Sequence, residues 1–343
     1  MQITFITIGP EGYSRSWNYF KGLQDLISGV QVIHLNPKGL LKQIVKVRKS
    51  QNKQSIYIVM SPSQYLTPLV WGLLSKKIIL DAGWSLYEGT TISRGIRGLQ
   101  SIKVYLIDFI ASQLAQRIIL ESNAQIDFYH KKFKIKKSKC VRLYTGVNEK
   151  NFIPNTNFHL PTNVFDSSKI VLFRGSYNHE GGLEVLAETT KILESQSITF
   201  WIFTPRLPAE LEFSKNTIVD RNYYPPSIIA RIQSACSISL GQLAKHERLN
   251  RTIPHKAYEA AFLGKAYLTG RNQGILEIFE EDKEISCFNP GDSIDLAKKI
   301  LELFTDPELL KNLGLNMQVK YNKVASQTHL SKKLLNTIKE TFE

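Results

Sequence analysis

The hydrophobic positions of the chain fall into short runs that alternate with longer amphipathic stretches. Each short run is followed by a segment in which apolar residues recur at helical spacing. In the first half, runs rich in β-branched residues predict strands at residues 3–8, 31–35, 56–60, 77–80 and 117–121. Strands that alternate with helices are typical of a parallel sheet covered by helices, so the first half is predicted to be an α/β domain.

The same order of elements begins again near Lys169. A strand is predicted at 170–173, a glycine-containing loop follows it, and a helix is expected over 183–193. Further strands are expected at 199–203, 218–219, 236–240, 266–269 and 284–288. The predicted fold class is therefore α/β, with two doubly wound, Rossmann-like parallel-sheet domains in series.

An irregular segment rich in Asn and Pro, residues 146–163, separates the two repeats of this pattern. We expect an N-terminal domain at 1–160, a C-terminal domain at 161–325 and a last helix at 326–343 that could pack back toward the N-terminal domain. The length of 343 residues agrees with two domains of about 150 residues each.

Composition narrows the class of protein. With 43% hydrophobic and 22% charged residues the chain has no signature of disorder, and no apolar run reaches the ~18 residues of a membrane span. The N-terminus resembles a strand and lacks the basic region of a signal peptide. Three scattered cysteines, Cys140, Cys236 and Cys287, have no metal-ligand spacing. We predict a cytoplasmic protein, with peripheral attachment to the inner face of the membrane as an open alternative.

The net charge of +14 is unevenly distributed. Residues 38–49 place lysines opposite apolar side chains at helical spacing, and residues 131–139 form a second basic segment. A solvated helix face around a buried stripe explains this pattern most simply. The alternative is attraction to an anionic membrane surface or a phosphorylated acceptor. Nucleic acid is not a predicted partner, because no motif for binding it accompanies the charge.

Candidate chemistry first appears in a helix predicted after residue 253. Pro254 suits the first turn of this helix and Gly264 suits its end. Lys256 and Glu259 lie three residues apart and therefore share one face. One cation and one carboxylate at the start of a helix can bind a phosphate and a sugar hydroxyl.

Each half also opens with a strand, a glycine-containing loop and a helix. Such a loop points backbone N–H groups at an anion. The first loop contains Gly9 and Gly12 and is followed by Arg15, and the second contains Arg174 and Gly175. Neither has the full dinucleotide-binding fingerprint, so a structural turn is an alternative for each. Together they suggest that the first contacts an acceptor and the second a diphosphate.

Several segments of the second half share their order and spacing with a known family. They are Tyr144-Thr-Gly-Val-Asn148 with Phe152-Ile-Pro154, Val171-Leu-Phe-Arg-Gly175, Ile253-Pro-His-Lys-Ala-Tyr-Glu259 with Gly264, and Gly274-Ile-Leu-Glu277 with Phe288-Asn-Pro-Gly-Asp292. Across about residues 144 to 310 the chain resembles the retaining, family-four type of GT-B glycosyltransferases, which use nucleotide diphosphate sugars. The first half matches only in outline.

The resemblance implies roles for individual residues. Glu259 would bind the ribose hydroxyls of the donor, and Lys256 would help to neutralise its phosphates. Residues Arg174, Gly175, Ser176, Tyr177 and Thr204 would line the same donor pocket. Such enzymes need no bound metal, and the nucleotide sugar is a co-substrate, so no cofactor is expected. A surface ion pair between Glu259 and Lys256 is the structural alternative.

The chain departs from the family pattern at two positions. A glutamate usually stands eight residues before Glu259, where this chain has Arg251, and a lysine usually stands at the position of Gly181. We predict that Arg251, with Arg248 or Lys245, supplies the missing phosphate-binding charge, since a guanidinium binds two oxygens at once. An ordinary basic loop before a helix is the alternative.

Two further segments are candidates for binding. Asp81 follows the strand at 77–80, at the sheet edge that faces a cleft in open α/β folds, and either orients an acceptor hydroxyl or caps a turn. Residues 222–226 lie where the family holds the base, although a packed aromatic pair explains them equally well. The predicted catalytic residues are Asp81, Arg251 and Glu259.

The predicted function is transfer of a sugar from a nucleotide diphosphate sugar to a glycan or lipid-linked acceptor in polysaccharide biosynthesis. Retention of the anomeric configuration and independence of metal follow from the resemblance. The first alternative is a catalytically degenerate GT-B module that binds a nucleotide sugar. A GT-B epimerase is less favoured, because no paired carboxylates and histidine for proton transfer are visible in the sequence.

Overall fold

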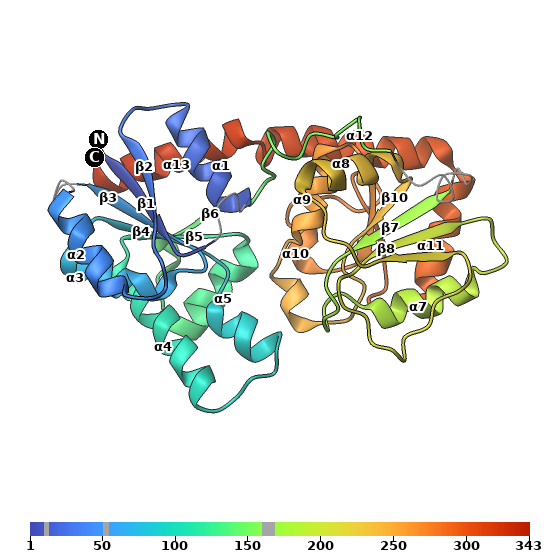
Figure 1. Cartoon of the computed structure of the whole chain (residues 1–343), viewed down its shortest axis with the longest axis horizontal. Helices are drawn as coiled ribbons and strands as arrows, with labels where there is room; N and C mark the ends of the chain where they lie inside the picture. Colours follow the sequence, from blue (N-terminus) through green and yellow to red (C-terminus); the bar gives the residue numbers. More distant parts are fainter. Residues whose placement is uncertain (10–13, 51–54, 160–168) are drawn as a thin grey trace. The chain divides into compact units, whose positions relative to one another are not determined.

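The computed structural model describes residues 1–9, 14–50, 55–159 and 169–343 (Figure 1). The chain divides into two compact units. Unit 1 comprises Met1–Asn148 together with Ala325–Glu343, and unit 2 comprises Glu149–Val324. The predicted domain boundary near residue 160 lies outside the described residues.

Unit 1 is built on a parallel sheet. Within the described residues the sheet has six strands in the order β2-β1-β3-β4-β5-β6. The strands are β1 (Ile3–Thr7), β2 (Val30–His34), β3 (Ile56–Met60), β4 (Ile78–Gly83), β5 (Arg117–Leu120) and β6 (Cys140–Arg142). All residues of β1 and β3 are buried, as expected where helices cover both faces of a parallel sheet. The predicted strands of this half are confirmed, and β6 was not predicted.

Helices cover both faces of this sheet. They are α1 (Ser14–Gln24), α2 (Leu40–Ser50), α3 (Thr67–Leu73), α4 (Leu99–Leu114), α5 (Asn123–Phe133) and α13 (Gln327–Phe342). Helices α1 and α13 pack together on one face, whereas α2, α3 and α4 lie side by side on the other (Figure 1). A Cβ at Gly22 would lie 1.6 Å from the Ser331 hydroxyl oxygen, so α1 and α13 pack closely because Gly22 has no side chain.

Unit 2 repeats the architecture. Its described residues form a six-stranded parallel sheet in the order β12-β11-β10-β7-β8-β9. The strands are β7 (Ile170–Arg174), β8 (Thr199–Phe203), β9 (Thr217–Asp220), β10 (Ile238–Leu240), β11 (Ala266–Gly270) and β12 (Ser286–Phe288). The strand order reverses between β7 and β10. In open parallel sheets, ligands bind outside the carboxyl ends of the strands at such a reversal.

The helices of unit 2 bury a core against this sheet. They are α7 (Leu183–Ile192), α8 (Pro226–Ala235), α9 (His255–Phe262), α10 (Gln273–Leu276), α11 (Ser293–Thr305) and α12 (Pro307–Val324). Local sequence sets several of their ends. Pro226 opens α8, and the Asp292 carboxylate caps α11 by accepting from two backbone N–H groups. Two parallel α/β sheets confirm the predicted fold class.

Candidate donor site

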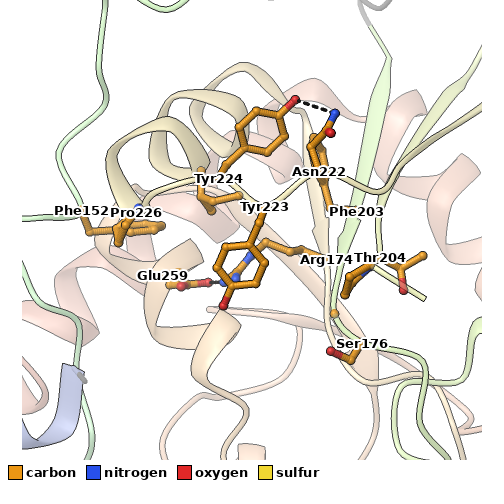
Figure 2. Close-up of a pocket in the computed structure, with 13 residues that line it drawn as sticks. Phe152, Arg174, Ser176, Phe203, Thr204, Asn222, Tyr223, Tyr224, Pro226 and Glu259 are labelled. Carbon is orange, nitrogen blue, oxygen red and sulfur yellow. Dashed lines mark hydrogen bonds and ion pairs between the residues drawn. The ribbon is translucent and has the colours of Figure 1, made fainter. Parts of the chain in front are cut away.

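A pocket of about 300 Å³ lies in unit 2 at the carboxyl ends of β7, β8 and β9 (Figure 2). Its position follows from the fold, because Arg174 ends β7, Phe203 ends β8 and the segment 222–224 follows β9. The helix α9 contributes Glu259. The lining residues are Phe152, Arg174, Gly175, Ser176, Phe203, Thr204, Pro205, Asn222, Tyr223, Tyr224, Pro226, Ile229 and Glu259.

Glu259 is a buried carboxylate held between two nitrogen-bearing side chains. Arg174 Nη2 donates to Oε2 in a direct ion pair, and His255 Nδ1, one helical turn earlier, lies 3.2 Å from Oε1. Burial opposes ionisation, but the neighbouring charges of Arg174 and His255 outweigh it and lower the pKa of Glu259 to about 2. The pocket therefore presents an ionised carboxylate whose two oxygens are directed by fixed partners.

Lys256 lies at the strand-order reversal of unit 2. Its Nζ donates to the Gly241 carbonyl oxygen just after β10 (2.8 Å) and lies 4.1 Å from the ring centroid of Phe173 in β7. Burial, with a contribution from the nearby Arg174 charge, lowers the pKa of Lys256 to about 7. Lys256 does not line the pocket, but its Nζ is close to Gly175, which does. A Cβ added to Gly175 would lie 3.9 Å from the Nζ. A cation is thus held next to the loop after β7.

Aromatic residues in and near the turn after β9 also line the pocket. The Tyr224 hydroxyl donates to Asp220 Oδ2 (3.0 Å), and the Asn222 backbone N–H donates to Asp220 Oδ1 (2.8 Å). The Tyr224 ring also packs edge-on against Phe203, with centroids 5.8 Å apart. These contacts fix the turn after β9. Tyr223 lines the pocket with 94% of its surface exposed.

The loop before α7 is shaped by a close backbone approach. Gly182 has φ +72°, and a Cβ there would lie 2.5 Å from the Ala244 backbone nitrogen. Glu180, in the same loop, accepts from Arg248 Nη1 at 2.9 and 3.0 Å. This ion pair ties the loop before α7 to the loop after β10.

The basic residues predicted to replace the family's lysine lie outside the pocket lining. Arg248 is paired with Glu180, Arg251 Nη2 lies 3.0 Å from Glu247 Oε1, and Lys245 is exposed. None of the three is a lining residue. Charge in the pocket itself comes from Arg174 and Glu259.

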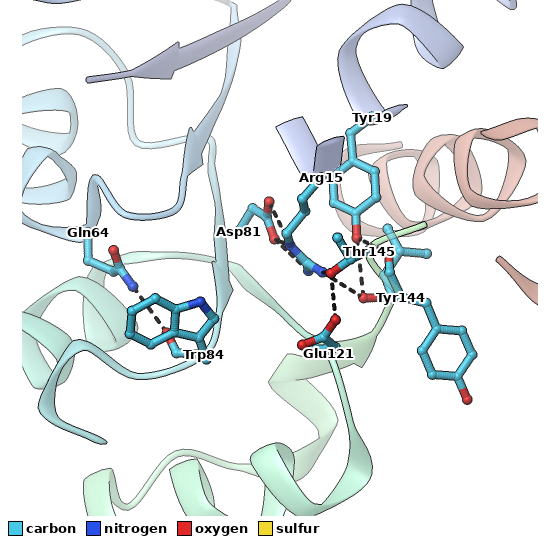
Figure 3. Close-up of polar contacts among 9 residues, drawn as sticks. Arg15, Tyr19, Gln64, Asp81, Trp84, Glu121, Tyr144 and Thr145 are labelled. Carbon is cyan, nitrogen blue, oxygen red and sulfur yellow. Dashed lines mark hydrogen bonds and ion pairs between the residues drawn. The ribbon is translucent and has the colours of Figure 1, made fainter. Parts of the chain in front are cut away.

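Unit 1 contains a buried polar cluster around Arg15 (Figure 3). Arg15 Nε and Nη2 donate to Asp81 (2.8–3.2 Å), and Nη1 donates to the Leu143 carbonyl oxygen and to Thr145 Oγ1. The Thr145 hydroxyl in turn donates to Glu121 Oε1 (2.5 Å). Arg15 and Asp81 are both buried. The cluster joins the start of α1 to the ends of β4, β5 and β6.

Part of the chain matches a known protein family. Residues 184–338 match the family model described as glycosyl transferase-like. The chain has the GT-B fold, and its C-terminal part is similar to a glycosyl transferase-like family. No curated protein sequence matches it.

Solved structures share the fold along the whole chain. HepE from Anabaena in complex with UDP has a TM-score of 0.71 at 13% identity, covering 99% of this chain and 100% of that one. Sucrose-phosphate synthase from Thermosynechococcus elongatus has a TM-score of 0.74 at 12% identity, with coverage of 100% and 99%. A glycosyltransferase from Rickettsia africae has a TM-score of 0.66 at 16% identity, with coverage of 100% and 99%.

The predicted donor-binding residues separate into two groups. The pocket is lined by Arg174, Gly175, Ser176, Thr204 and Glu259. Tyr177 is not in the lining, and its hydroxyl instead donates to Glu184 (2.7 Å). Sequence reasoning assigned no site role to the apolar lining residues Phe152 and Ile229, since nothing in their residue types separates them from the core.

The structure changes the interpretation of the predicted acceptor-side residues. Asp81 does not line an open edge, because both of its oxygens accept from Arg15 and it is fully buried. This geometry favours a structural role for the pair. The Gly9 backbone N–H donates to Thr7 Oγ1 (2.8 Å), and Gly12 lies outside the described residues.

Two features are absent from the described part of the chain. No group of three or more His, Cys, Asp or Glu side chains in the described ranges is arranged to hold a metal ion. Within the same ranges, no helix has both the length and the apolar character needed to cross a bilayer.

Proposed function

We propose that the pocket of unit 2 binds a nucleotide diphosphate sugar, whose sugar is transferred to a glycan or lipid-linked acceptor in polysaccharide biosynthesis. The observation that carries the proposal is the grouping of Arg174, Glu259 and Lys256 at the carboxyl ends of β7 and β10. Structures of HepE contain UDP and UDP-glucose. Uridine diphosphate sugars are therefore the first donors to test.

Glu259 is proposed to bind the ribose of the donor. An ionised carboxylate accepts a hydrogen bond at each oxygen, which suits two neighbouring hydroxyl groups. For both oxygens to face the ribose, Arg174 must move from Glu259 to the diphosphate. Tyr223 is proposed to stack on the base, because its exposed flat ring lines the pocket.

The diphosphate is proposed to be neutralised by side chains rather than by a metal ion. Arg174 and Lys256 are proposed to carry this charge inside unit 2, at the carboxyl ends of β7 and β10. Negative charge builds on the diphosphate as the glycosidic bond breaks, so cations fixed beside it stabilise the transition state. Transfer with retention and unchanged activity in the presence of a chelator are the expected results.

Calorimetric and thermal-unfolding titrations with UDP-glucose and other nucleotide sugars test the donor site. Ligand binding raises the unfolding free energy by about 2.7 kcal/mol at a concentration of about 100 Kd. The unfolding temperature should rise for the wild type and for Glu188→Ala, an exposed carboxylate of α7, but not for Glu259→Ala.

Release of the sugar is measured in parallel as hydrolysis of the same donors. If no nucleotide sugar stabilises the wild type and none is hydrolysed or transferred, the proposed donor site is wrong. Equal stabilisation of the wild type and Glu259→Ala would instead remove Glu259 from the site.

A further inference from the structure

The outer face of α4 is an exposed apolar stripe. Leu99, Ile102, Leu106 and Ile110 are 86%, 56%, 47% and 42% exposed. Their spacing of three, four and four residues places them on one side of the helix, over a length of about 17 Å. Exposed apolar patches of this kind on a folded domain mark a surface that binds a partner.

The inner face of α4 combines apolar contacts with the core, among them Ala111, with fully buried polar residues. Asp108 is fully buried and accepts from the Ser85 hydroxyl (2.6 Å) and the Tyr87 backbone N–H (2.9 Å). Ser112, one turn later, is also fully buried. The hydrogen bonds of Asp108 fix the rotation of α4 about its axis, so the apolar stripe must face outward.

The neighbouring helices on the same side of the sheet extend this apolar surface. Helices α2 and α3 lie beside α4 in the order α2, α3, α4 (Figure 1). Trp71 on α3 and Leu41 and Val45 on α2 are exposed. The Lys76 ammonium lies 5.0 Å from the Trp71 ring centroid. We call the outer surface of these three helices the α2–α4 face.

Exposed charge in the stretch of chain that contains α2, α3 and α4 has one sign. From Leu35 to Leu114 the acidic residues are Asp81, Glu88 and Asp108, and all three are fully buried. The described basic residues of the same stretch are all exposed. They are Lys38, Lys42, Lys46, Arg48, Lys49, Lys76, Lys77, Arg94, Arg97 and Lys103.

We propose that the α2–α4 face docks on an anionic lipid surface. The apolar side chains of α4, with Trp71, would enter the boundary between head groups and acyl chains, while the surrounding lysines and arginines contact lipid phosphates. An exposed apolar helix face flanked by basic segments, with the helix too short to span a bilayer, is typical of a surface that lies in the interface. This inference goes beyond the donor site, and it would bring unit 1 to a lipid-linked acceptor.

The same observations disfavour other partners. A symmetric contact between two copies of the chain would place the basic residues of one α2–α4 face against those of the other. Lysines are also depleted in the centres of protein–protein interfaces. Nucleic acid would match the charge but not the apolar stripe, because its outer surface is phosphate and sugar.

Sedimentation of the full-length chain with lipid vesicles tests the proposal. The vesicles contain phosphatidylcholine alone or phosphatidylcholine with phosphatidylglycerol, at low and at high salt. The wild type should sediment with the anionic vesicles, and less so at high salt. Leu99→Glu and the double variant Ile102→Glu with Leu106→Glu should each reduce binding about tenfold or more, because a carboxylate is repelled by the lipid and replaces an apolar contact.

Val319→Glu is the matched control, since Val319 is exposed on α12 of unit 2. Its binding to vesicles should equal that of the wild type. Failure of the wild type to bind anionic vesicles at low salt would overturn the proposal, as would equal binding by Leu99→Glu. Dimerisation that Leu99→Glu abolishes, without vesicle binding, would assign the face to a second copy of the chain. None of these results depends on donor binding or transfer.

Discussion

Raising the pH should weaken donor binding, because Lys256 loses its proton near neutrality. In the empty protein, burial lowers the pKa of Lys256 to about 7, and the nearby charge of Arg174 adds to the effect. A diphosphate brought beside its Nζ favours the protonated form and raises the pKa of Lys256 again. At a pH above the pKa that Lys256 has in the empty protein, donor binding is therefore accompanied by uptake of a proton. The affinity for the donor falls as the pH rises.

The size of the effect follows from the fraction of Lys256 that carries a proton. For a group that titrates near pH 7, this fraction falls about tenfold between about pH 6 and about pH 8. The affinity should fall by the same factor, which corresponds to about 1.4 kcal/mol. Each further pH unit should weaken binding by about another factor of ten while the bound lysine stays protonated.

Isothermal titration calorimetry with UDP-glucose measures this dependence directly. A nucleotide sugar is preferred to a free nucleotide diphosphate, whose terminal phosphate has its own ionisation near about pH 6. Repeating the titration in buffers with different ionisation enthalpies should show uptake of about one proton per site at about pH 8.

Lys256→Met supplies the control, because it keeps a long apolar side chain and removes the titrating group. Its affinity should be lower than that of the wild type and independent of pH. A wild-type affinity that stays constant over this range would refute the reasoning. The same pH dependence in Lys256→Met would assign the titration to another group.

Three other substitutions test separate parts of the structure. Asp81→Ala should lower the free energy of unfolding by about 3–5 kcal/mol, measured with urea, because it leaves the Arg15 guanidinium buried without its carboxylate. Tyr223→Ala should leave unfolding unchanged and weaken UDP-glucose binding by about tenfold, since the exposed ring has no role in the core. Gly182→Ala should destabilise unit 2 by more than about 1 kcal/mol in urea unfolding, because φ is positive and the Cβ meets backbone.

The strands were predictable where burial leaves a continuous apolar run. All residues of β3 are buried, and its sequence Ile-Tyr-Ile-Val-Met has no competing interpretation. β6 was missed for the opposite reason. Its three residues, Cys140–Arg142, are only partly buried and contain a single β-branched side chain. Such a short edge strand forms because β5 offers it a partner, which local sequence does not reveal.

Part of the site was predictable because residues directly after a parallel strand lie at one edge of the sheet. That reasoning located Arg174 and Gly175, and the family resemblance added Ser176; all three line the pocket. It could not show that Asp81, at the end of β4, is already paired with Arg15 from another helix. Pairing between residues that are distant in sequence decides whether a strand-end carboxylate faces a ligand or the core.

Residues 38–49 were noted for their charge, but the sequence alone did not reveal the α2–α4 face. The helical spacing of apolar residues in α4 is the same whether the stripe faces the core or the solvent. The direction in which the stripe faces is set by Asp108, whose hydrogen-bond donors, Ser85 and Tyr87, lie in the segment after β4. Only the fold shows that this polar residue is the buried one.

Glu259→Gln provides an independent test of the charge balance in the pocket. The negative charge of Glu259 raises the pKa of Lys256, against the larger effects of burial and Arg174. Removing that charge should lower the pKa of Lys256 below about 7, so the affinity for UDP-glucose should begin to fall at a lower pH than in the wild type.

The ribose contact that the variant loses weakens binding at every pH and can be separated from this shift. At low pH Lys256 is protonated in both proteins, so the difference in affinity there measures the lost ribose contact together with the lost ion pair to Arg174. If the pH at which the affinity begins to fall is unchanged or higher in Glu259→Gln, Glu259 does not act on Lys256. The arrangement of Arg174, Lys256 and Glu259 would then not be the coupled phosphate and ribose site that their geometry indicates.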